Sequence, residues 1–70
     1  MAAELYKAHY NTTDDPEVDA QTSQLGEKLQ SMEEILATCA KFSIHARVAQ
    51  DGKIIGEVVN QQFVKVAPAS

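Results

Sequence analysis

Two side chains capable of acid and base chemistry, His45 and Glu57, are predicted to lie opposite each other on neighbouring strands. A histidine beside a carboxylate suits general acid and base catalysis, and Arg47 is expected diagonally across from Glu57. An oligomeric enzyme with an intersubunit site around His45 and Glu57 is therefore one hypothesis. The competing interpretation is a polar cluster on a solvated sheet face, since the sequence indicates no nucleophile, oxyanion site or enclosing pocket. We predict that the chain is not an enzyme and has no catalytic residues.

The spacing of the residues that bind metals and cofactors gives little support for either. His9 and His45 are far apart, and neither a His-x-x-x-His nor a Cys-x-x-Cys pattern occurs. Cys39 is the only cysteine, and it falls at an apolar position where a thiol packs as a small hydrophobe. The three glycines are scattered, and none leads from a strand into a helix as a phosphate-binding loop requires. No metal and no cofactor is predicted.

The charge balance bears on the class of partner. The net charge of −4 opposes attraction to nucleic-acid phosphates and to anionic lipid. The aromatic residues are dispersed, unlike those of a base-stacking platform. The acidic residues suggest another hypothesis, an acidic decoy that blocks a nucleic-acid-binding groove. They lie between Asp14 and Asp19 and at Glu27, Glu33 and Glu34. Such charges usually cap and solvate a helix, so neither nucleic acid nor membrane is predicted as a partner.

The elements that position these residues are predicted to form one small domain, residues 1–70, of the α+β class. Residues 1–14 are interpreted as an N-terminal arm. Asp14, Asp15 and Pro16 form a helix start, because an aspartate caps free N–H groups and proline suits the first helical position. Apolar residues then recur at alternating steps of four and three, which predicts one long amphipathic helix over residues 16–41. Gly26 falls inside that helix, where it marks either a close approach or nothing.

A three-stranded antiparallel meander is predicted over residues 42–67, because the apolar period changes to two after Phe42. Asp51-Gly52 predicts a hairpin. We favour a three-residue loop with Gly52 left-handed, because a two-residue loop would set Glu57 opposite Ala46 on the buried face. A second turn at Asn60-Gln61 should lead into a last strand from Gln62 to Ala67.

The second predicted strand is apolar on both faces, which is the main functional clue. Ile54 and Val58 are expected to point one way and Ile55 and Val59 the other, yet one helix covers only one face. The uncovered face must then meet the N-terminal arm, a second copy of the chain or a different protein. The residues predicted to form this partner interface are Leu5, Tyr6, Tyr10, Ile55, Glu57, Val59, Val64 and Val66.

The leading functional hypothesis is a small acidic protein-interaction module that acts by binding another protein. It would be an assembly or accessory subunit, or a small inhibitor of the kind that viruses encode. So short a chain without an internal disulfide favours association, so a homo-oligomer, most simply a dimer, is expected. A lone cysteine, no secretory leader and no long apolar run predict a cytoplasmic protein.

Overall fold

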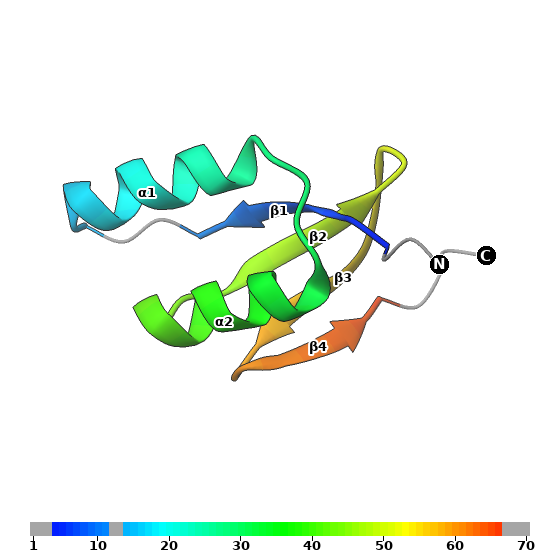
Figure 1. The fold of residues 1–70 in the computed structure, drawn as a ribbon. Helices are drawn as coiled ribbons and strands as arrows, with labels where there is room; N and C mark the ends of the chain where they lie inside the picture. The colour runs from blue at the N-terminus through cyan, green and yellow to red at the C-terminus, as the bar shows by residue number, and fades with distance from the viewer. Residues whose placement is uncertain (1–3, 12–13, 67–70) are drawn as a thin grey trace.

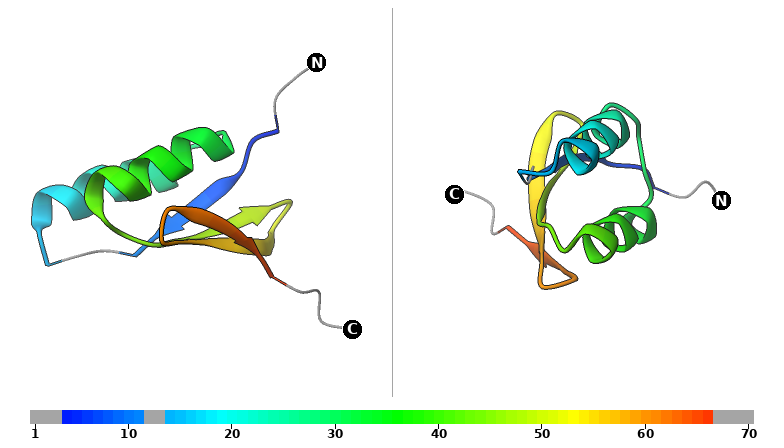
Figure 2. Two further views of the ribbon diagram at one scale, coloured as in Figure 1. Left: turned by 90° about the horizontal axis from the view of Figure 1, so that it is seen from below. Right: turned by 90° about the vertical axis from the view of Figure 1, so that its left-hand side faces the viewer.

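The protein is described by a computed structural model that covers residues 4–11 and 14–66. A four-stranded antiparallel sheet in the order β1-β2-β3-β4 carries two helices on one face (Figures 1 and 2). The α+β class is confirmed, with one helix and one strand more than predicted. The elements in chain order are β1 (Lys7–Tyr10), α1 (Pro16–Gly26), α2 (Met32–Phe42), β2 (Ala46–Gln50), β3 (Lys53–Val59) and β4 (Gln62–Lys65).

The prediction of one long helix over residues 16–41 was wrong, although its start at Pro16 is confirmed. The chain leaves the helix after Gly26 and begins a new one at Met32. Ser31 caps the second helix: its side chain accepts a hydrogen bond from the Glu34 N–H and donates one to the Glu34 carboxylate, both 3.3 Å long. The Ser31 hydroxyl thereby satisfies one of the backbone N–H groups that a new helix end leaves open, which favours a break before α2.

The linker between the helices is fastened to β1. The Tyr6 N–H donates to the Gln30 carbonyl at 2.8 Å, and the Gln30 N–H donates back to the Tyr6 carbonyl at 2.9 Å. The Tyr10 hydroxyl donates to the Gln30 side-chain oxygen at 2.6 Å, which satisfies this buried amide. We call this set of three hydrogen bonds the Gln30 clamp.

The segment predicted as an arm contains strand β1, so that part of the prediction was wrong. Lys7–Tyr10 pairs antiparallel with β2, and Ala8 lies opposite Val48 with both side chains fully buried. Pairing satisfies backbone groups that the edge of β2 would otherwise expose, and it completes the core beneath the helices. Residues 1–3 and 12–13 of the predicted arm lie outside the described residues.

The prediction of a three-residue loop in the first hairpin was also wrong, because the loop has two residues. Gln50 pairs with Lys53, and the two residues between them, Asp51 and Gly52, both have positive φ, as a type I′ turn requires. A bulge at Ile55 then shifts the register by one residue. The bulge removes the objection to the short loop, because Glu57 lies opposite Arg47 and not opposite Ala46.

The second hairpin has the predicted turn at Asn60-Gln61, again with positive φ at both residues. Strand β4 ends at Lys65, earlier than the predicted Ala67, which lies outside the described residues. The Phe63 ring on β4 lies over Gly56, where an added Cβ would come within 2.5 Å of it. Ile35, Cys39, Val48 and Val58 fill the core between α2 and the sheet.

Gly26 marks a close approach between α1 and β1. A Cβ at this position would lie 2.9 Å from the Ala8 carbonyl oxygen. Helix propensity alone favours Gly26→Ala by about 1 kcal/mol, whereas forced overpacking costs about 1–3 kcal/mol. We therefore expect Gly26→Ala to lower the free energy of unfolding, measured by urea denaturation. The matched control is Ser23→Ala at an exposed position of the same helix, which should not destabilise. A stabilised Gly26→Ala variant would contradict the packing of α1 on β1.

Candidate functional site: the outer face of the sheet

The face of the sheet opposite the helices, called the outer face here, is uncovered in the described part of the chain (Figure 2). Side chains alternate between the two faces of a strand, and Ala8, Val48 and Val58 point into the core. Their neighbours must therefore point outward. The outer face carries Lys7 and His9 from β1, Arg47 and Ala49 from β2, Ile54, Glu57 and Val59 from β3, and Val64 from β4.

The central row of this face contains an oppositely charged pair. His9, Arg47, Glu57 and Val64 lie side by side across the four strands. Arg47 and Glu57 are directly opposite each other, in place of the predicted diagonal arrangement. A directly opposed pair of unlike charges stabilises a sheet by about 0.2–1 kcal/mol. The Arg47–Glu57 pair therefore contributes to the stability of the sheet and also makes the centre of the outer face polar.

His45 does not lie opposite Glu57, so the predicted acid and base pair is not formed by strand pairing. His45 precedes β2, and its carbonyl accepts a hydrogen bond of 2.9 Å from the Asn11 N–H. His45 and Glu57 do border the same shallow hollow, of about 110 Å³, together with Arg47. A drug-sized ligand needs about 300–1,000 Å³, so this hollow does not enclose a substrate.

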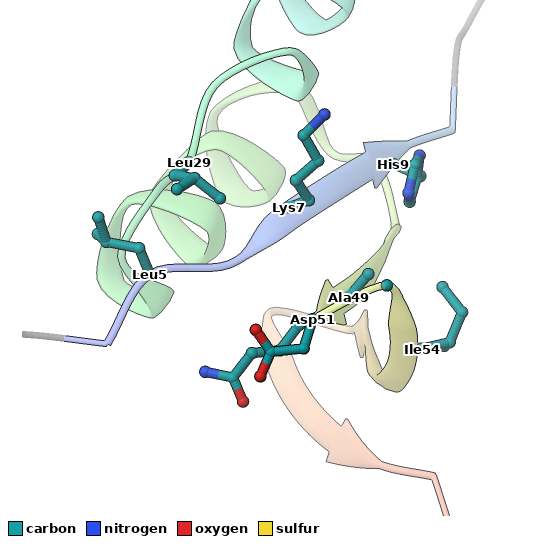
Figure 3. Close-up of a pocket in the computed structure, with 9 residues that line it drawn as sticks. Leu5, Lys7, His9, Leu29, Ala49, Asp51 and Ile54 are labelled. Carbon is teal, nitrogen blue, oxygen red and sulfur yellow. The ribbon is translucent and has the colours of Figure 1, made fainter.

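A larger hollow, of about 310 Å³, lies where the edge of β1 meets the tip of the first hairpin (Figure 3). Leu5 and Leu29 lie together on one side of it, and Ile54 lies on the hairpin side. These three side chains are 45%, 59% and 46% exposed. Lys7 and Asp51 also line the hollow, so its border carries a charge of each sign beside the aliphatic side chains. Leu29 and Ile54 were missed as surface residues, because the sequence pattern assigned both to buried stripes.

A second apolar area lies toward β4. Val64 is 54% exposed and Val66 is 44% exposed, while Val59 is partly buried. Strand alternation puts all three on the outer face. Large exposed aliphatic side chains are therefore found at both ends of the face, with the Arg47–Glu57 pair between them. Grouped exposed aliphatic residues are typical of contact surfaces.

The residues predicted to form a partner interface fall into two groups. Leu5, Glu57, Val59, Val64 and Val66 lie on the outer side of the sheet. The second group, Tyr6, Tyr10 and Ile55, packs against the buried core cluster, and Ile55 does so at the bulge. The structure therefore brings the first group together and separates it from the second.

The four aromatic residues of the chain all pack against the core cluster. They are Tyr6, Tyr10, Phe42 and Phe63. Among the described residues, none of these four rings projects from the outer face. Among the described residues, no three or more His, Cys, Asp or Glu side chains come close enough to hold a metal ion. No helix in the same residues is long and apolar enough to cross a membrane.

The charges are divided between the two layers. The segment of residues 14–42, which forms both helices, carries most of the acidic side chains. Two acids near the helix starts have local roles there: Asp15 accepts a hydrogen bond of 3.0 Å from the Glu17 N–H, and the Glu34 carboxylate accepts one of 3.3 Å from the Ser31 hydroxyl. The outer face instead carries Lys7, His9 and Arg47, with Glu57 beside them. A partner of this face meets a surface that is not acidic.

Comparisons with known proteins add no identification. No protein-family model, curated protein or solved structure matches this chain.

Cys39 lies in the core at 1% exposure, and burial raises the pKa of its thiol. Unfolding lets the thiol ionise near its ordinary pKa of 9.0, so the unfolded chain loses this proton first as pH rises. We expect the protonated Cys39 thiol to contribute fully to the free energy of unfolding below pH 9.0. This contribution is lost as pH rises toward the folded pKa, and the free energy of unfolding falls by at most about 1.4 kcal/mol per pH unit.

The measurement is urea denaturation at several alkaline pH values, with Cys39→Ala as the comparison. Burial also raises the pKa of Tyr10, and that contribution remains in both proteins. The free energy of unfolding should therefore fall more steeply with pH in the parent chain than in the variant. Parallel pH profiles would show that the thiol titrates alike in the folded and unfolded chains.

Proposed function

We propose that this chain is a small protein-interaction module that binds another protein through the outer face of its sheet. The observation that carries the proposal is the uncovered face itself, with exposed aliphatic side chains at both ends and a charged pair at its centre. In this role the chain is an accessory subunit or a small inhibitor of a larger protein. A cytoplasmic location suits its lone reduced cysteine.

The composition of the face suggests the chemistry of the partner. Apolar side chains at an interface gain about 25 cal/mol per Å² of surface removed from water, so Ile54 and Val64 favour an aliphatic counterpart. Lys7 and Arg47 favour acidic groups in that counterpart, because complementary charge steers and selects a partner. We therefore propose a partner surface that combines aliphatic and acidic side chains.

Binding is favoured over catalysis by the placement of the polar groups. His45 and Glu57 border a small open hollow and are not paired by the sheet register. Binding through the outer face is also favoured over an acidic decoy, because Asp15 has a structural role as the cap of α1 and Glu34 is hydrogen-bonded to Ser31, the cap of α2. A decoy would lose affinity steeply with added salt, whereas an interface built on aliphatic contacts would not.

Site-specific photocrosslinking tests the proposal. A photoreactive amino acid replaces Glu57, an exposed residue at the centre of the outer face, in cells that naturally make the chain. The control carries the same group in place of Glu33, an exposed residue of α2. We expect position 57 to give a discrete adduct with a different protein, identified by mass spectrometry, at a yield at least several-fold above that of position 33.

Two results would count against the proposal. Equal labelling from both positions would mean that the outer face is not the binding surface. Adducts from position 57 with nucleic acid, or only with a second copy of the chain, would mean that no foreign protein covers the face. Circular dichroism of each variant checks that the fold is retained.

A further inference from the structure

The two edges of the sheet differ in how far the chain itself covers them. At the β1 edge, the Gln30 clamp occupies the outward backbone groups of Tyr6. The end of α1 also lies against this edge, since Gly26 approaches the Ala8 carbonyl closely. In residues 4–11 and 14–66, the β4 edge has no such cover. An uncovered edge strand exposes N–H and C=O groups that can pair with another strand.

The hydrogen-bond pattern shows which backbone groups this edge presents. The Val66 N–H donates to the Ile55 carbonyl at 3.0 Å. Alternate residues of an antiparallel strand bond to the same neighbour, so Gln62 and Val64 also face β3. The N–H and C=O groups of Phe63 and Lys65 therefore point away from the sheet.

We infer that the β4 edge pairs with β4 of a second copy of this chain, antiparallel and about a two-fold axis at Val64. In this register Phe63 lies opposite Lys65 of the second copy, and each of these two pairs exchanges two backbone hydrogen bonds. The two Val64 side chains meet at the centre on the outer face. The same contacts occur twice, as a two-fold interface requires. The inference goes beyond the proposed function, because it concerns the sheet edge and not the outer face.

The side chains select this register over its neighbours. A shift that centres the pair on Lys65 would set two lysines directly opposite each other, which is destabilising. A shift that centres it on Phe63 would bring the Asn60-Gln61 turn into the pairing and shorten the paired length. The register centred on Val64 pairs residues 62–66 throughout and places each Lys65 opposite Phe63 of the other copy, away from the second lysine.

The second copy is favoured over a foreign strand by this self-complementarity. A lysine at an edge often protects a strand from pairing, but here the two-fold register keeps the lysines of the two copies apart. The product is one continuous sheet made of both copies, with all helices on one side. Its outer face joins the valine areas of the two copies around Val64.

Engineered disulfide formation tests the register. Two Val64 residues in a pair without mutual hydrogen bonds have Cα atoms about 4.5 Å apart, within the range of about 4.4–6.8 Å that a disulfide needs. The control is Val66→Cys, a similarly exposed position whose two copies would lie about 14 Å apart along the strands. Under mild oxidation we expect Val64→Cys to form a disulfide-linked dimer at least tenfold faster than Val66→Cys. Cys39 stays in both proteins because it is buried.

The mass in solution provides the second measurement, by light scattering over a dilution series. The parent chain should approach twice its mass of 7.6 kDa as the concentration rises. Lys65→Pro removes an outward N–H without breaking a bond to β3, so it should leave the fold intact and the chain monomeric. Lys65→Thr keeps that N–H and should still dimerise. Circular dichroism shows whether each variant is folded.

Three outcomes would overturn the inference. They are a parent chain that stays monomeric at every concentration, a Lys65→Pro variant that dimerises like the parent, and equal rates of disulfide formation at positions 64 and 66. None of them decides the proposed function, because that function is tested by a crosslink between position 57, one strand inside the β4 edge, and a different protein.

Discussion

The Gln30 clamp is the constraint on which the arrangement of the whole molecule depends. It ties the linker between the helices to the first strand, residues that are distant in sequence, through two backbone hydrogen bonds and one side-chain hydrogen bond. Because the linker is held at the β1 edge, α1 and α2 both lie on the same side of the sheet. The helices then cover one face, and none of the other described elements covers the second face. The clamp also occupies part of the β1 edge, so the two edges of the sheet become unequal.

The bulge at Ile55 divides the apolar residues of β3 between the two faces. Without it, the two-residue turn at Asp51-Gly52 would place Glu57 on the buried side. With it, Ile55 packs on the core, Val58 is fully buried and Glu57 lies beside Arg47 in water. One unpaired residue therefore lets a tight turn and a consistent core coexist in the same hairpin. It also leaves Ile54, on the far side of the bulge, at the border of the larger hollow.

The features predicted correctly from the sequence are those that depend on a few neighbouring residues. The helix start at Pro16 and the turns at Asp51-Gly52 and Asn60-Gln61 follow from backbone preferences of a few residues. The start of α2 after Ser31 was missed, because the regular apolar spacing through Leu29 predicted an unbroken helix. That spacing was misleading, because Leu29 lies in the linker and is more than half exposed.

The remaining features depend on contacts between distant residues, which a single sequence does not display. Lys7–Tyr10 is too short to reveal a strand, and it becomes one because β2 and the Gln30 clamp hold its two sides. Ile55 differs from Ile54 only by its place relative to the bulge. For the candidate site, Val59 and Val64 were predicted correctly to point away from the core, whereas the opposition of His45 and Glu57 failed with the register.

The division of charge changes what the net charge implies for binding. Interactions between exposed charges are screened beyond about 8 Å at physiological salt, so a partner on one face senses mainly the charges of that face. The acids of the helical layer lie behind the core, while Lys7 and Arg47 lie at the surface of the sheet. The overall charge of −4 therefore does not by itself repel an acidic partner from the outer face. The outer face thus combines exposed aliphatic side chains with a few charges, and both kinds of contact are open to a binding partner.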